Sequence, residues 1–154
     1  MEFIISIVSV AIALSSFLIS GAVLLVNLRK AKIETINTYL QNERDPCFIE
    51  ARKTVYNLGK DYDPEEVDCL YGEKISVLIS FYCQAAIMVE KGYLPFSFFK
   101  QYSGYAVCML YRILEPHIKW RREKKANRHP DYAKMYEWLY NRICKGRGEG
   151  FLDK

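Results

Sequence analysis

The sequence predicts an all-α protein in which one N-terminal transmembrane helix continues into a small cytosolic helical bundle. Three observations lead to this fold class. The run from Phe3 to Leu28 contains no charged residue, and about 20 apolar residues suffice to cross a bilayer. Asp-Pro pairs and single glycines divide the rest of the chain into helix-length segments. No segment alternates apolar and polar residues in the way that is typical of strands.

The first element is the apolar run, which we interpret as a retained membrane span rather than a cleaved signal peptide. No basic residue precedes the run, and it is longer than the apolar core of a signal peptide. Arg29, Lys30 and Lys32 follow it directly. Because positive charge stays on the cytoplasmic side, we expect the N-terminus to face outward. Residues 1–28 then form the transmembrane helix and residues 29–154 the cytosolic domain.

One face of the span differs from the others. Its members recur at alternating spacings of three and four, which is a heptad pattern, and most of them are small or polar: Ser6, Ser9, Ala13, Ser16, Ser20, Val23 and Asn27. Such a face is typical of helices that pack against other helices in lipid. It is also typical of helices that line a narrow aqueous path. A lone anchor whose serines bond to their own backbone is the third interpretation.

The cytosolic helices follow from their start and stop signals. The first helix is expected to continue to Arg44. The others are expected from Asp45-Pro46 to Gly59 with an inner stripe of Phe48, Ala51, Val55 and Leu58, from Asp63-Pro64 to Lys91, from Phe96 to Lys125, and from Pro130 to Lys145. The stretch from Ile75 to Val89 is apolar nearly all round, which predicts a buried central helix. Pro116 should kink or split the helix that contains it.

Composition and motifs exclude several functions. Apolar residues make up 51% of the 154 residues and charged residues 26%, so the chain is not mainly disordered. The five cysteines are an odd number and form no C-x-x-C, which predicts reduced thiols rather than a disulfide framework or a zinc site. We find no phosphate-binding loop and no metal-ligand spacing. We therefore expect no metal and no cofactor.

One pair of residues carries potential chemistry. Arg112 and His117 form an R-x4-H, and Arg122 and His129 form an R-x6-H. The spacing resembles the motif of the HEPN superfamily of helical ribonucleases, whose His can serve as general acid or base while the Arg stabilises phosphate charge. The residue after the Arg is usually polar in active members, whereas here it is Ile113. We therefore expect Arg112 and His117 to hold helices together rather than to cleave RNA.

A basic run follows this motif. Its cations are Lys119, Arg121, Arg122, Lys124, Lys125 and Arg128. Phosphate of RNA, with Trp120 stacking on a base, and anionic lipid headgroups would both suit this run. A solvated helix end or a contact between subunits would also explain it.

An aromatic run extends from Tyr93 to Phe99 and is followed by Tyr102 and Tyr105. It is either the core corner between two helices or an exposed contact surface.

In its layout of an N-terminal span, a small all-α domain and a degenerate R-x4-H, the chain resembles the small membrane-anchored accessory proteins of type VI-B CRISPR systems. Glu50-Ala51-Arg52 and Gly92-Tyr93-Leu94 also resemble a broad bacterial family of membrane-anchored helical domains without an assigned function. The first resemblance implies a HEPN-like cytosolic bundle that is anchored to the bacterial inner membrane by a single N-terminal span. It also implies a ring-shaped homo-oligomeric pore that permeabilises or depolarises this membrane in antiphage defence, beside an RNA-guided, RNA-cleaving effector. A membrane-tethered ribonuclease or RNA-binding protein and a passive adaptor are the alternatives.

Overall fold

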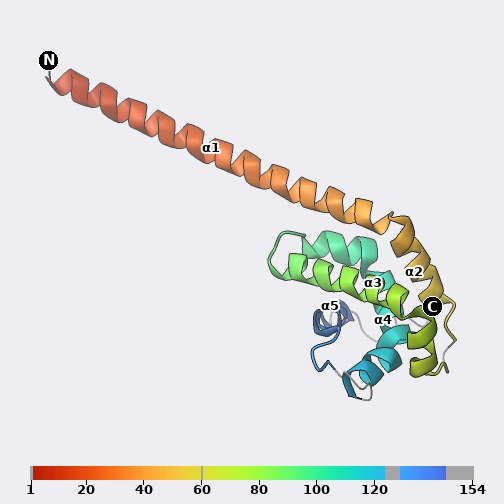
Figure 1. Ribbon diagram of the computed structural model, residues 1–154. Helices are drawn as coiled ribbons and strands as arrows, with labels where there is room; N and C mark the ends of the chain where they lie inside the picture. The colour runs from red at the N-terminus through yellow and green to blue at the C-terminus, as the bar shows by residue number, and fades with distance from the viewer. Residues whose placement is uncertain (1, 60, 124–128, 145–154) are drawn as a thin grey trace. The chain divides into compact units, whose positions relative to one another are not determined.

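The computed structural model describes residues 2–59, 61–123 and 129–144, and the side chains of the first helix from Ile12 onward. These ranges contain five α-helices: α1 (Glu2–Glu43), α2 (Pro46–Tyr56), α3 (Pro64–Glu90), α4 (Phe96–Glu123) and α5 (Lys134–Cys144) (Figure 1). The described ranges contain no strand. The predicted all-α fold class is therefore confirmed.

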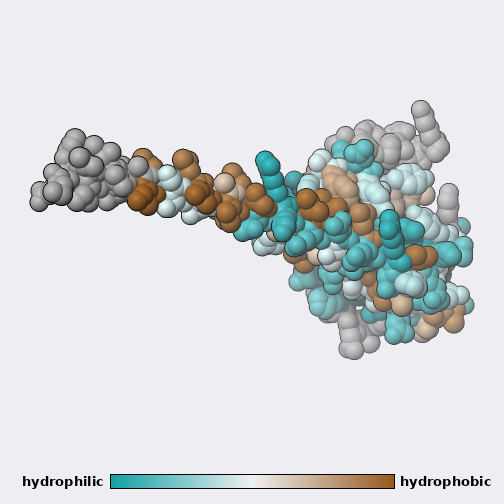
Figure 2. All heavy atoms as spheres, turned by 90° about the horizontal axis from the view of Figure 1, so that it is seen from above, coloured by the Kyte–Doolittle hydropathy of each residue, from teal (hydrophilic) through white to brown (hydrophobic). Residues whose placement is uncertain are grey.

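The chain divides into two compact units, residues 1–37 and residues 38–154. The first unit is the greater part of α1. Its large apolar side chains are exposed, including Phe17 at 77% and Leu18 at 71%. Figure 2 shows apolar and paler residues along this part of α1, followed by hydrophilic ones. This helix is long and apolar enough to cross a membrane. A signal sequence would meet the same criteria of length and composition.

The second unit contains the last turns of α1 and the helices α2 to α5. Its helix starts follow the predicted capping signals. The Asp45 carboxylate accepts hydrogen bonds from the backbone N–H groups of Cys47 and Phe48, and Asp63 accepts one from Glu65. Each Asp is followed by a proline at the first helical position, where the missing N–H costs nothing.

The centre of the second unit is α3, which contacts α2, α4 and α5. Its inward residues are fully or nearly fully buried: Val67, Ile75, Leu78, Ile79, Tyr82, Ala85, Ala86 and Val89. The predicted buried central helix is thus α3, although Val77 and Ile87 on its outer side are 41% and 44% exposed. The helix still passes for a membrane span by length and composition, but 44% of its most apolar window is buried within the domain, as in a core helix.

Two predicted boundaries were wrong. The second helix ends at Tyr56, so Leu58 lies beyond it instead of completing its inner stripe. The last helix begins at Lys134 rather than at Pro130. Residues 130–133 form turns, and Ala133 has a positive φ of 58°, which no continuous α-helix can contain.

Pro116 does not split α4, which runs from Phe96 to Glu123. A proline inside a helix removes one backbone hydrogen bond and crowds the carbonyl four residues earlier, here that of Arg112. The Tyr62 hydroxyl donates to the neighbouring carbonyl of Ile113 at 2.7 Å. Tyr62, in the segment before α3, therefore stabilises α4 at the turn that the proline weakens.

Candidate interhelical site around His117 and the membrane-span stripe

Arg112 and His117 lie on the same helix but do not form one site. Five residues turn an α-helix through roughly 500°, so their side chains point about 140° apart. His117 is fully buried, and its Nε2 lies 3.1 Å from Oδ1 of Asp68 on α3. Arg112 is exposed, and its Nε donates to the Tyr140 hydroxyl of α5 at 3.4 Å. Each side chain thus joins α4 to another helix, but to a different one.

Asp68 gathers a polar cluster that we call the Asp68 cluster, consisting of Asp68, His117 and Arg121. The Arg121 guanidinium lies 2.6 Å from the same Asp68 oxygen that faces His117. Arg121 also lies over the Tyr132 ring, 5.3 Å from its centroid. Gly72 gives the carboxylate room, because a Cβ at this position would lie 3.1 Å from Asp68 Oδ1.

The sequence predicts that His117 joins two helices, but it does not predict the partners Asp68 and Arg121. Asp68 precedes His117 by 49 positions, and no local pattern relates them. The one available signal is that His117 and Arg121 are four residues apart. They therefore lie on one face of α4, beside the buried Leu114 and Ile118. Polar residues on an inward face need polar partners from another helix.

The basic run is largely engaged with acids in the part that the structure describes. Lys119 pairs with Glu115 at 2.8 Å and Arg121 with Asp68. Arg122 pairs with Glu137 at 2.8 Å and donates through Nε to the Tyr132 carbonyl. Lys124, Lys125 and Arg128 lie outside the described residues.

Trp120 lines a pocket of about 460 Å³. The other residues that line it are Asp63, Pro64, Glu65, Pro116, Lys119 and Glu123. Three carboxyl side chains and one ammonium group line this pocket. Phosphate would be repelled there by the excess of negative charge. The arrangement around Trp120 therefore gives little support to RNA binding at this position.

The second motif, R-x6-H, also has its arginine engaged elsewhere. Arg122 is held by Glu137 and by the Tyr132 carbonyl, as described above. The His129 side chain is exposed, and its backbone N–H donates to the Arg121 carbonyl. Arg122 and His129 thus each make a hydrogen bond between the end of α4 and the residues that precede α5.

The aromatic run divides between both interpretations. Leu94 and Phe99 are fully buried and form the core corner between α3 and α4. Tyr93, Tyr102 and Tyr105 are 63%, 52% and 51% exposed. The run is thus a core corner on its inner side and an aromatic surface on its outer side.

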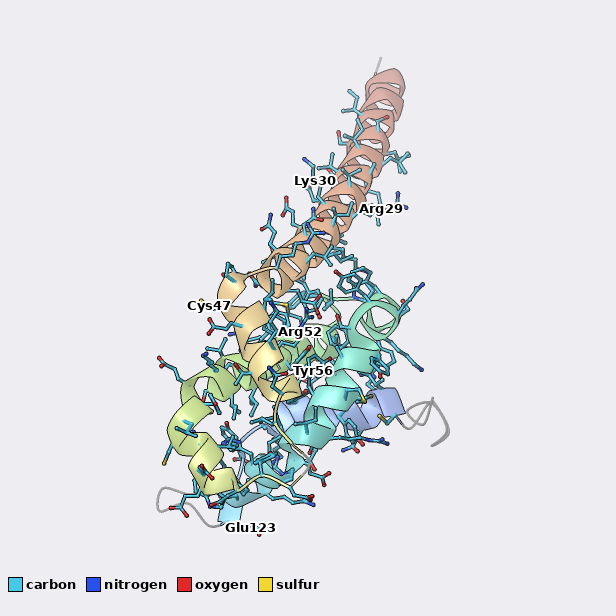
Figure 3. All side chains as sticks on the ribbon, turned by 90° about the vertical axis from the view of Figure 1, so that its right-hand side faces the viewer. Arg29, Lys30, Cys47, Arg52, Tyr56 and Glu123 are labelled. Carbon is cyan, nitrogen blue, oxygen red and sulfur yellow. The ribbon has the colours of Figure 1, made fainter. Side chains whose placement is uncertain are left out.

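The stripe of the membrane span is exposed along its described part. Ala13, Ser16, Ser20 and Asn27 are all exposed, and Val23 is 53% exposed. Ser6 and Ser9 belong to the part of α1 whose side chains lie outside the described residues. At 100° per residue, Leu18 lies on the face of α1 opposite the stripe. Arg29 and Lys30 follow the apolar run (Figure 3).

A second polar cluster, also missed from the sequence, joins the last turns of α1 to α4 within the domain. The Ser103 hydroxyl donates to Glu43 Oε1 at 2.9 Å, and Tyr39 donates to the same oxygen at 2.9 Å. The oxygens of Tyr39 and Ser103 are 2.6 Å apart. Tyr39 is buried and packs against the rings of Phe81 and Phe99. These contacts fix the end of α1 to the domain core.

Within the described residues, no group of three or more His, Cys, Asp or Glu side chains is arranged to hold a metal ion. The described groups thus show structural pairing of charges, a buried histidine, and one exposed apolar helix with a small and polar face.

Fold and sites define an all-helical protein with a candidate N-terminal transmembrane helix. The family described as Domain of unknown function (DUF4760) matches residues 3–143, and the chain belongs to this family. The match includes both the apolar run and the helical domain. No curated protein and no solved structure matches the chain significantly.

Proposed function

We propose that the protein is a single-pass membrane protein whose α1 helices assemble, in several copies, around a narrow path lined by the stripe. The observation that carries this proposal is the heptad face of mostly small and polar residues on a helix whose other faces are mainly Ile, Val, Leu and Phe. Lipid favours Leu, Ile and Phe, so a face of mostly small and polar residues is of use where it meets other helices or water. The exposure of Ser16, Ser20 and Asn27 leaves this face available to other copies of the chain.

The proposed topology has the N-terminus outside and the helical domain in the cytoplasm. The basic residues Arg29, Lys30 and Lys32 support it. A C-terminal alkaline phosphatase fusion should be inactive, and a C-terminal fluorescent protein fusion should be bright. The opposite pattern would refute this orientation.

A ribonuclease is the alternative that the R-x4-H suggests. His117 is fully buried against Asp68, and Arg112 points toward Tyr140. A general acid or base must come within hydrogen-bond reach of the reacting hydroxyl. The arrangement supports structural roles for both residues better than RNA cleavage, and we propose that the protein is not an enzyme.

The resemblance extends the proposal to antiphage defence. There the pore would permeabilise or depolarise the inner membrane beside an RNA-guided, RNA-cleaving CRISPR effector. A gene neighbourhood that contains such an effector, together with higher phage resistance when both proteins are expressed, would support this context. Equal resistance with and without the chain would contradict it.

The test of the pore compares Ser16→Leu and Ser20→Leu with Leu18→Ser. A bulky apolar side chain in a narrow path blocks and dewets it. We expect the two leucine variants to keep the oligomeric size of the wild type in detergent and to lose ion conductance in liposomes. Leu18→Ser, on the opposite face, should keep both properties.

Other outcomes distinguish the alternatives. Loss of the oligomer in the leucine variants would indicate a packing face without a path. Unchanged conductance in both variants would refute the assignment of this face to a pore. A wild-type protein that is monomeric in detergent would favour a passive adaptor.

A further inference from the structure

Two cysteines far apart in the sequence meet between α4 and α5. Cys108 is buried on α4, and Cys144 is the last residue of α5 and is half-buried. Their Sγ atoms are 2.9 Å apart. A disulfide bond is about 2.05 Å long, so the sulfur atoms lie within about 0.9 Å of bonding distance.

The helices α4 and α5 pack closely beside the two cysteines. Gly104 lies one turn before Cys108, and a Cβ at this position would lie 3.6 Å from Ile143 Cγ2. That distance is ordinary van der Waals contact, so residue 104 of α4 and Ile143 near the end of α5 are close neighbours. Farther along α5, the buried Tyr136 hydroxyl donates to the Val107 carbonyl at 3.1 Å. The hydrogen bond between Tyr136 and Val107 holds α5 against α4 next to Cys108, and Ile143 lies beside Gly104 next to Cys144.

We propose that Cys108 and Cys144 are a reversible modification site that forms an intramolecular disulfide when the protein meets a peroxide. The Cys144 thiolate, which solvent reaches, attacks one peroxide oxygen, and the O–O bond breaks. This gives a sulfenic acid on Cys144 and one molecule of water after protonation. The Cys108 sulfur then attacks the Cys144 sulfur, the S–O bond breaks, and a second water leaves. The two thiols together lose two electrons, and hydrogen peroxide is reduced to two waters.

The modification would cross-link the ends of a segment that includes the α4–α5 turn. A disulfide restricts the unfolded chain, and the separation of 36 residues is long enough for a substantial effect. A cytosolic protein would hold these residues as thiols at rest and form the bond transiently under oxidative stress. The prediction of reduced thiols from the sequence then describes the resting state only.

The experiment treats the full chain in detergent with hydrogen peroxide, blocks the remaining thiols with an alkylating reagent, and analyses unreduced peptides by mass spectrometry. We expect a peptide that links Cys108 to Cys144, and its loss after treatment with dithiothreitol. The apparent melting temperature should rise by roughly 5–10 °C in the oxidised protein. Circular dichroism before and after treatment checks that the helices remain folded.

Matched variants make the test decisive. Cys144→Ser and Cys108→Ser should each abolish the linked peptide, while Cys47→Ser and Cys69→Ser, at exposed positions, should leave it unchanged. Further oxidation of Cys144 while Cys108 remains open to alkylation would overturn the proposal. Cross-links that run through Cys47 or Cys69, without a Cys108–Cys144 peptide, would overturn it as well.

Discussion

Replacing His117 with alanine should destabilise the domain far more than replacing Arg112. His117 is fully buried and bonds to Asp68, which also pairs with Arg121. The substitution leaves a cavity of ring size and removes a hydrogen bond from a carboxylate that is only 10% exposed. Together these losses should cost about 3–5 kcal/mol. Arg112 makes its hydrogen bond to Tyr140 at the surface, so Arg112→Ala should cost less than about 1 kcal/mol.

The assay is thermal unfolding of the full chain in detergent, followed by circular dichroism. For a domain of this size, the loss at His117 should lower the melting temperature by roughly 10 °C or more, and the loss at Arg112 by only a few degrees. A double-mutant cycle with Asp68→Ala should give a coupling energy of about 1–3 kcal/mol for the His117–Asp68 pair.

Two results would refute this reasoning. Equal melting temperatures for His117→Ala and the wild type would mean that the Asp68 cluster does not stabilise the domain. Wild-type stability combined with the loss of a measurable RNase activity in both variants would favour the ribonuclease.

The remaining predictions concern pH and helix packing. Burial raises the pKa of Tyr82 and Tyr136 well above the usual 10.0, and that of Tyr111 to about 12. These tyrosines keep their protons in the folded state while the unfolded chain ionises from pH 10 upward, so stability should fall above that pH. The loss should reach up to about 1.4 kcal/mol per pH unit for each fully buried tyrosine. The absorbance of tyrosinate serves to monitor unfolding as the pH rises. Unfolding that begins only above pH 12 would contradict the predicted loss of stability. Gly104→Ala should raise stability by about 0.5–1 kcal/mol, because its Cβ fits in ordinary contact and alanine favours the helix. Gly72→Ala should lack this gain in stability, because its Cβ would press on Asp68 Oδ1 at 3.1 Å. Unfolding in denaturant measures both variants. Equal gains in stability at the two glycines would show that Asp68 is not held in place.

The sequence by itself determined the features that depend on neighbouring residues. The caps at Asp45 and Asp63 work through backbone groups two or three residues away, so they are visible in the sequence. The apolar run and the heptad stripe depend only on spacing along one helix. The fold class follows from the same local signals.

Only the tertiary structure decided which side chains meet across helices. Asp68 with His117, Tyr39 with Ser103, and Cys108 with Cys144 are pairs separated by 49, 64 and 36 positions. No periodicity relates such positions, because their contact depends on how the helices pack and rotate against one another. Arg112 and His117 illustrate the converse. They are close in sequence and suggest a common site. The rotation of about 100° per residue in an α-helix nevertheless directs them toward different partners.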